Sequence, residues 1–142
     1  MIESLSALLF ALNALHTTLD TVDPYAIVPV IPIEQELTTE EIVKVVFRDD
    51  PIMVAISKCE SGMRQFDANG NVVKGARDKR DTGIFQINTY YHGEEAKRLG
   101  HDITTLEGNL AYAKTLYEKE GTRPWNASKK ECWGKAYPNG QV

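Results

Sequence analysis

The chain has 142 residues, which is enough for one globular domain with its own core and too few for two comfortable ones. Hydrophobic residues make up 42% of it and charged residues 25%, ordinary values for a soluble folded protein. The net charge of −4 excludes a general electrostatic attraction to nucleic acid or to an anionic envelope, so we expect no nucleic-acid partner.

Residues 1–37 are predicted to form an N-terminal helix followed by a proline-rich extended segment. Leucines recur at helical spacing from Leu5 to Leu19, which predicts an amphipathic helix. This stretch is apolar enough for a secretion signal, but no basic residue precedes Lys44, so an intact signal peptide is not expected. It is also too short for a membrane span, and the remnant of a trimmed membrane anchor is the alternative. Residues 23–33 carry three prolines, which predicts an extended connector.

Two helix starts open a predicted globular domain over residues 38–142. Residues 38–41, TTEE, have the Thr-x-x-Glu spacing of a capping box, which predicts a short helix through Phe47. Residues 49–51, DDP, combine an acidic N-cap with proline at the first helical position and predict a second start. The mostly apolar helix that follows should be buried and should end at Gly62, because glycine is the usual left-handed C-cap.

Residues 66–88 predict a small antiparallel sheet after the buried helix. Asn69-Gly70 is a strong tight-turn signal inside the segment FDANGNVV, which suits a hairpin. Asp67, Asn69 and Asn71 alternate like the start of a calcium loop, but the glycine lies one place early and the closing Glu is missing. We therefore expect a hairpin turn here and no metal site.

The last part of the chain is predicted to hold one long helix and a packed tail. The helix runs from about Thr105 to Glu118, with apolar residues at helical spacing on its inner face. The tail after Gly121 is rich in aromatic residues and should pack back on the body. Together these elements predict an α+β fold, mostly helical, with a small antiparallel hairpin or sheet inserted after the central helix.

The two cysteines, Cys59 and Cys132, lie far apart and have no C-x-x-C spacing or histidine cluster, so they do not indicate a zinc site. They are either two buried free thiols or a single disulfide, which would require an oxidising compartment. Closing a loop of that length would stabilise the fold by about 4 kcal/mol through chain entropy, less any strain. Composition leaves both alternatives open.

Glu60 lies in the last turn of the buried helix, where the negative end of the helix dipole is unfavourable for an anion. A carboxylate in such a position usually has a task or a partner, and a surface side chain at a frayed helix end is the alternative. Cleavage of a glycosidic bond needs an acid that protonates the leaving oxygen, with support for an oxocarbenium-like centre. A helix-end Glu60 followed by a hairpin that bears Asp81 would place two carboxylates across a groove.

Three segments resemble the animal-type lysozymes and occur in the same order. Residues 60–62 are ESG, residues 81–88 are DTGIFQIN and residues 121–125 are GTRPW, where that family carries E-S-G, D-Y-G-I-F-Q-I-N and G-x-R-x-W. The wider lysozyme-like superfamily, which includes bacterial lytic transglycosylases and resuscitation-promoting factors, shares the E-S-G step and a G-x-x-Q segment. The position of Cys59 directly before the E-S-G step, with Cys132 after a Trp-containing stretch, is more similar to the resuscitation-promoting group.

The resemblance covers roughly residues 50–133 and implies a lysozyme-like catalytic domain with Glu60 as general acid. Asp81 matches the nucleophilic or charge-stabilising carboxylate, and Trp125 matches the indole that packs against the acid. Burial against Trp125 would raise the pKa of Glu60 by disfavouring the anion, while a wetter sheet would keep Asp81 ionised. The alternatives are a turn-capping Asp81, because lytic transglycosylases work without a second carboxylate, and a Trp125 that serves only the core.

The candidate substrate-binding residues come from the same resemblance. Gln86 and Asn88 match amides that line the groove and hydrogen-bond sugar hydroxyls and N-acetyl groups, and Tyr91 falls where the family stacks an aromatic ring on a sugar. For Gln86 the alternative is a hydrogen bond to the sheet backbone. Tyr91 and Tyr112 are equally compatible with sugar platforms and with core packing. The histidines lack partners at ligand spacing, and no metal or cofactor is expected.

These observations predict a muramidase that hydrolyses the β-1,4 bond between N-acetylmuramic acid and N-acetylglucosamine in peptidoglycan glycan strands. The alternatives are a lytic transglycosylase, which leaves 1,6-anhydro-muramyl ends, and a catalytically silent glycan-binding module. Animal-type lysozymes usually have several disulfides and a basic surface, whereas this chain is acidic and has at most one disulfide. We therefore expect a bacterial or phage-related wall enzyme at an extracytoplasmic location, secreted, in the cell envelope or surface-exposed.

Overall fold

The computed structural model describes residues 36–139, so the N-terminal helix and proline-rich connector predicted before them lie outside the described residues. The chain divides into two units between Gln35 and Glu36. About half of the described residues are helical, and the sheet among them has two antiparallel strands. The predicted α+β class, mostly helical with a small antiparallel sheet, is confirmed. Within residues 36–139, no helix combines the length and the apolar character that crossing a membrane requires.

The first two helices have the boundaries that their local signals predict. Helix α1, Thr39–Val46, begins with a capping box: the Thr38 hydroxyl accepts a hydrogen bond from the Glu41 amide, and the Glu41 carboxylate accepts one from the Thr38 amide. Helix α2, Pro51–Ser61, has proline in its first turn and ends at Gly62. The φ of Gly62 is +66°, a left-handed conformation that favours glycine.

The sheet lies later in the chain than the Asn-Gly turn. Strands β1, Asp81–Thr82, and β2, Ile87–Asn88, pair antiparallel and are joined by a turn over residues 83–86. The segment around the predicted hairpin does turn back on itself, but it forms isolated bridges and no regular strand pair: Phe66 pairs with Val72, and Lys74 pairs with Thr82 on β1. The predicted turn is therefore present, while the regular strand pair sits at the D-T-G-I-F-Q-I-N segment.

The elements after the sheet are all helical, and only the long helix among them was predicted from the sequence. The long helix predicted from Thr105 is confirmed, and the Thr105 hydroxyl caps it by accepting a hydrogen bond from the amide of Gly108. In chain order these elements are α3 (Thr89–Arg98), α4 (Leu106–Glu120), the 3-10 turn η1 (Arg123–Trp125), α5 (Asn126–Lys129) and the 3-10 turn η2 (Trp133–Lys135).

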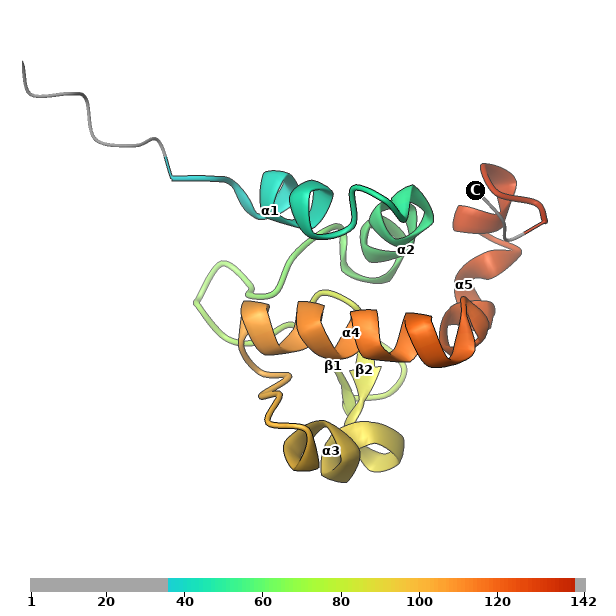
Figure 1. Ribbon diagram of the computed structural model, residues 1–142. Helices are drawn as coiled ribbons and strands as arrows, with labels where there is room; N and C mark the ends of the chain where they lie inside the picture. The colour runs from blue at the N-terminus through green and yellow to red at the C-terminus, as the bar shows by residue number, and fades with distance from the viewer. Residues whose placement is uncertain (1–35, 140–142) are drawn as a thin grey trace, which may run out of the picture. The chain divides into compact units, whose positions relative to one another are not determined.

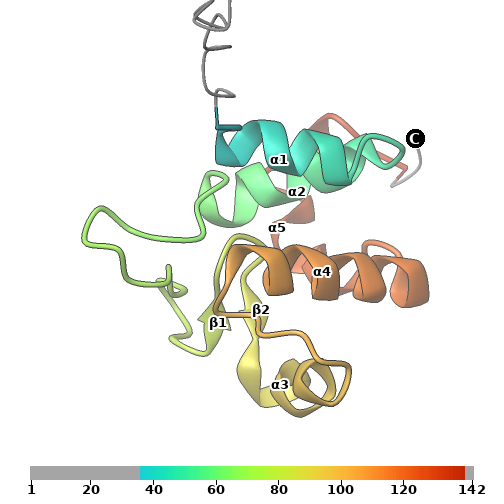
Figure 2. The same ribbon diagram turned by 60° about the vertical axis from the view of Figure 1, so that its left-hand side comes forward.

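Helix α4 runs through the middle of the described domain, as Figures 1 and 2 show. Helices α1 and α2 lie together on one side of it, and α3 lies with the two strands on the other side. Helix α5 follows the C-terminal end of α4 and contacts α2. The end of the chain is thus brought back to the helix that carries Glu60.

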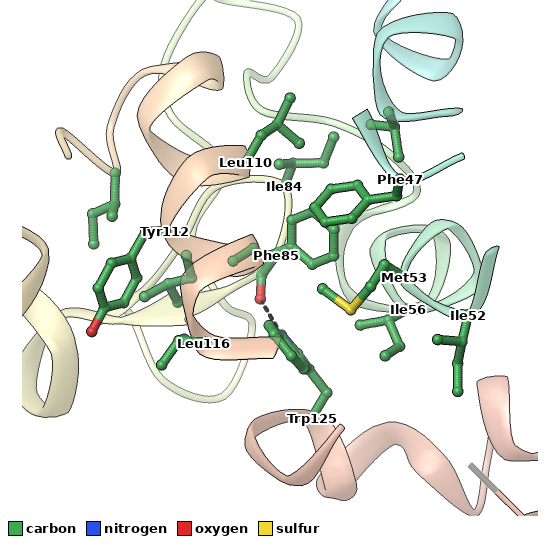
Figure 3. Packing of buried hydrophobic residues seen from close by; sticks show 14 of the residues in the cluster. Phe47, Ile52, Met53, Ile56, Ile84, Phe85, Leu110, Tyr112, Leu116 and Trp125 are labelled. Carbon is green, nitrogen blue, oxygen red and sulfur yellow. Dashed lines mark hydrogen bonds between the residues drawn. The ribbon is translucent and has the colours of Figure 1, made fainter. Parts of the chain in front are cut away.

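Phe85 occupies the middle of the hydrophobic core (Figure 3). The centroid of its ring lies 5.2 Å from that of Phe47 in an edge-to-face arrangement and 5.7 Å from that of Trp125. The Trp125 indole N–H also donates a hydrogen bond of 3.0 Å to the Phe85 carbonyl. Trp125 and Trp133 are 4% and 1% exposed, so the aromatic tail packs back on the body as predicted.

Cys59 and Cys132 form a disulfide, which decides between the two alternatives left open by the sequence. The bond joins the last turn of α2 to the residue before η2 and closes a loop with a sequence separation of 73. In the chain-entropy model a loop of this length stabilises the fold by about 4 kcal/mol. The disulfide and the packing of Trp133 together hold the tail against α2.

Candidate active site

A pocket of about 250 Å³ gathers most of the residues predicted to carry function. Its walls come from the end of α2, both strands, the start of α3, Leu116 of α4, and the η1–α5 segment. Six of the seven candidate catalytic and substrate-binding residues line it: Glu60, Asp81, Gln86, Asn88, Tyr91 and Trp125. Residues that are separated by up to 65 positions in the sequence therefore share one cleft.

A larger groove of about 670 Å³ is lined by residues of α1 and α2 and by Ala136 and Tyr137. Its walls are mainly apolar, with Glu40 and three basic side chains among them. It contains no pair of carboxylates and no residue of the sheet. We assign the candidate active site to the smaller pocket, because a general acid and a second carboxylate converge only there among these two cavities.

Glu60 is half-buried in the last turn of α2. Burial raises the pKa of its carboxyl group, the hydrogen bond from Ser128 lowers that pKa, and the negative charge of Asp81 raises it; the net shift is upward. The Ser128 hydroxyl lies 2.5 Å from Oε1 of Glu60. A carboxyl group that keeps its proton to higher pH than usual has the property that a general acid needs near neutral pH.

Asp81 is half-buried on β1 and is held by the residue opposite to it on β2. The strand register pairs Asp81 with Asn88, and the Asn88 Nδ2 donates a hydrogen bond of 2.7 Å to Oδ1 of Asp81. The same Nδ2 lies 3.2 Å from Oδ2 of Asp78, while Oδ1 of Asn88 caps α3 by accepting from the amide of Tyr90. Both polar ends of Asn88 therefore have protein partners, and its evident task is to fix the orientation of Asp81.

The other predicted residues of the cleft combine structural contacts with access to the pocket. Gln86 donates a hydrogen bond of 2.8 Å to the carbonyl of Gly83, the backbone contact that the alternative predicted, and it also lines the pocket. Tyr91 is 71% exposed at the rim, edge-on to Tyr90 with ring centroids 5.0 Å apart. Trp125 belongs to both the core and the cleft wall.

Tyr112 does not line the cleft. It is 1% exposed and packs in the core, and its hydroxyl lies 3.3 Å from Nδ1 of His92. Of the two uses weighed for Tyr112, its position agrees with core packing, because a sugar ring cannot stack on a buried face. His92, for which no role was predicted, is half-buried, lines the pocket, and has its pKa lowered by burial.

The turn over residues 83–86 is held by two buried amide side chains that the sequence does not single out. Oε1 of Gln65 accepts from the amide of Ile84 at 2.8 Å, and Oδ1 of Asn109 accepts from the amide of Phe85 at 3.1 Å. Nδ2 of Asn109 donates to the carbonyl of Thr82 at 2.9 Å. These bonds replace the ladder that so short a sheet lacks, and they fix the spacing between Asp81 and the rest of the cleft.

Within residues 36–139, no group of three or more His, Cys, Asp or Glu side chains is arranged to hold a metal ion. No family model, curated protein or solved structure matches the chain. The assignment of a function therefore rests on the residues of the cleft and on the motifs that they form.

Proposed function

We propose that residues 38–142 form a lysozyme-like catalytic domain that cleaves the glycan strands of peptidoglycan, with Glu60 as general acid. The observation that carries the proposal is a half-buried Glu60 with a raised pKa in the same pocket as a second carboxylate, Asp81. The three ordered motifs support it, because their residues Glu60, Asp81, Gln86, Asn88 and Trp125 line that one pocket.

In the proposed reaction Glu60 transfers its proton to the glycosidic oxygen as the bond to the anomeric carbon of N-acetylmuramic acid breaks. Asp81 attacks that carbon or stabilises its positive charge. Water then adds to the carbon and displaces the Asp81 carboxylate where it has bonded there, while the Glu60 carboxylate takes the water proton, which restores the acid. The opposed surroundings of the two groups, a desolvated Glu60 and an Asp81 that accepts an amide hydrogen bond, favour this division of roles.

Substrate binding is assigned to the cleft walls, and no cofactor is needed. Tyr91 offers an exposed ring at the rim on which a sugar can stack, and Gln86 offers its remaining amide oxygen. Trp125 forms the apolar wall. Asn88 acts through Asp81 in this proposal, since both of its polar ends are occupied.

A lytic transglycosylase is the second candidate, and the disulfide favours it. The Cys59–Cys132 pair matches the cysteine placement of the resuscitation-promoting group more closely than that of the animal lysozymes. In this reaction the C6 hydroxyl of the muramic acid replaces water and closes an anhydro ring, with Glu60 first as acid and then as base. The disulfide also supports an oxidising, extracytoplasmic location.

The test is digestion of purified peptidoglycan by the wild type and by Glu60→Gln, with released muropeptides identified by mass spectrometry. We expect reducing-end products from the wild type and a loss of at least about 100-fold in Glu60→Gln, because the acid is gone. Glu118→Gln, the same substitution at an exposed position on α4, is the control and should keep full activity.

Anhydro products, which lack one water, would identify the transglycosylase. Equal activity in the wild type and Glu60→Gln would contradict the role of Glu60. No products from either protein would contradict an enzymatic function and leave the glycan-binding module.

A further inference from the structure

The hydroxyl of Ser128 lies at the centre of a hydrogen-bonded group behind the proposed acid. Its Oγ is 2.5 Å from Oε1 of Glu60, 3.0 Å from the indole nitrogen of Trp133, and 3.1 Å from the carbonyl oxygen of Trp125. Trp133 is 1% exposed, and its N–H also lies 3.1 Å from the Trp125 carbonyl. Ser128 is therefore held between a buried donor and two acceptors.

A serine hydroxyl has one hydrogen to donate, so it cannot serve Glu60 and the Trp125 carbonyl at the same time. When Glu60 is ionised, the Ser128 hydrogen points to the carboxylate and its oxygen accepts from Trp133. When Glu60 is protonated, its own O–H donates to Ser128, and the Ser128 hydrogen turns to the Trp125 carbonyl. Rotation about one C–O bond satisfies both states, and no proton is transferred to serine.

We propose that Ser128 is a positioning residue that holds the Glu60 carboxyl group in one orientation in both of its protonation states, with Trp133 fixing the serine oxygen. The inference rests on the proposed function, since it assigns a partner to the general acid. A general acid must lose and regain its proton within each catalytic cycle. A partner that hydrogen-bonds only the protonated or only the ionised carboxyl group would therefore leave the other form without a fixed orientation.

The other charged and titratable groups near Glu60 are few. Asp81 on β1 and Tyr91 and His92 on α3 line the same pocket. On α5 the neighbouring charge is Lys129, whose Nζ lies over the ring of Trp133, 5.5 Å from its centroid. Among the described residues Ser128 is the one side chain with a hydrogen bond to the Glu60 carboxyl group.

The test is a ¹³C NMR titration of the Glu60 side-chain carboxyl in the folded protein, together with the pH dependence of kcat/KM on peptidoglycan. Ser128→Ala removes the bond that favours the anion, so the pKa of Glu60 should rise and the alkaline limb of the profile should move to higher pH. At neutral pH kcat should fall by about tenfold with KM little changed, because orientation is lost while the substrate contacts remain.

Ser128→Thr keeps the hydroxyl and is the matched control, with the wild-type pKa and pH profile expected. Trp133→Phe removes the indole donor together with part of the buried ring, and it should move the pKa of Glu60 in the same direction as Ser128→Ala, which provides a second variant if the first fails to fold. An unchanged kcat in both Ser128→Ala and Trp133→Phe would overturn the inference, because Glu60 would then keep its orientation without the serine. A shifted titration in a protein without turnover would support the link between Ser128 and Glu60 and contradict the glycosidase.

Discussion

The proton affinity of Glu60 is set by neighbours that act in opposite directions. Burial and the charge of Asp81 raise its pKa, and the hydrogen bond from Ser128 lowers it. Removing a contact that raises a pKa lowers that pKa, and removing a contact that lowers it has the opposite effect. The two neighbours can therefore be separated by substitution, one residue at a time.

Asp81→Asn should lower the pKa of Glu60 relative to the wild type, the opposite of the effect of Ser128→Ala. The asparagine has nearly the same shape and still accepts from Asn88, but it carries no negative charge. In a muramidase, hydrolysis should also fall by about 100-fold, because the second carboxylate is lost. The measurements are the Glu60 titration by NMR and the rate of muropeptide release.

Asp49→Asn is the control for Asp81→Asn, because Asp49 is exposed on the surface and pairs only with Arg48 among the described residues. Asp49→Asn should leave the pKa of Glu60 and the rate of hydrolysis at their wild-type values. If Asp81→Asn left the Glu60 titration unchanged, the two carboxylates would not interact. Unchanged hydrolysis would remove Asp81 from the mechanism and favour transglycosylation.

At the scale of elements, the sheet depends on side chains outside it. Two strands of two residues each form too few backbone bonds to be stable alone, and Gln65 and Asn109 supply the missing partners for the turn between them. Gly83 lies between the two amides: a Cβ there would be 2.4 Å from Nδ2 of Asn109 and 2.5 Å from Oε1 of Gln65. The close approach explains why glycine stands at this position.

Asn109→Ala should lower the free energy of unfolding by about 3 kcal/mol, because it leaves the buried Phe85 amide and the Thr82 carbonyl without their side-chain partner and removes one of the two donors to the Ile103 carbonyl. Urea denaturation followed by circular dichroism measures this loss. Asn126→Ala, at an exposed position, is the control and should change stability by less than about 0.5 kcal/mol. A loss in Asn109→Ala as small as the control's would mean that the turn is held by other contacts.

Elements with a local signal were predictable from the sequence. The capping box at Thr38, the proline at Pro51 with the glycine at Gly62, and the cap at Thr105 each fix a boundary through neighbours in the chain. Helix α3 was not predicted, because it has little apolar periodicity and a glycine at its centre; its cap, Asn88, was interpreted only as a groove amide.

The candidate site was predictable only where a motif carries it. The ordered motifs indicated the carboxylates and the aromatic wall of the cleft, and the structure places these residues in one pocket. Ser128 and His92 have no such signal. Their partners, Glu60 and Tyr112, lie 68 and 20 residues away, and nothing in the spacing of the sequence joins them.

For the whole molecule, a buried acid with a raised pKa is a source of instability. The pKa of Glu60 is higher in the folded chain than its ordinary value of 4.5, so the folded state binds this proton more tightly than the unfolded state. The stability that this group contributes is complete below pH 4.5 and is lost as the pH rises through its folded pKa.

Glu60→Gln should therefore be more stable than the wild type at neutral pH and equal to it at low pH. The amide stays neutral throughout, and its oxygen still accepts from Ser128. Thermal unfolding of both proteins from pH 4 to pH 8 measures the difference, with Glu118→Gln as the exposed control. If the difference in stability between Glu60→Gln and the wild type were the same at every pH in this range, ionisation of Glu60 would not be its cause.

The hydrogen bond between Ser128 and Glu60 also has a consequence for the order in which the protein is made. A ribosome completes Glu60 68 residues before Ser128, and Cys59 73 residues before its partner Cys132. Until that later segment is synthesised and docked, the emerging acid has neither its serine partner nor the tail that packs beside it. The nascent chain would therefore carry Glu60 without the hydrogen bond that lowers its pKa, and that bond would form only after the tail has been synthesised.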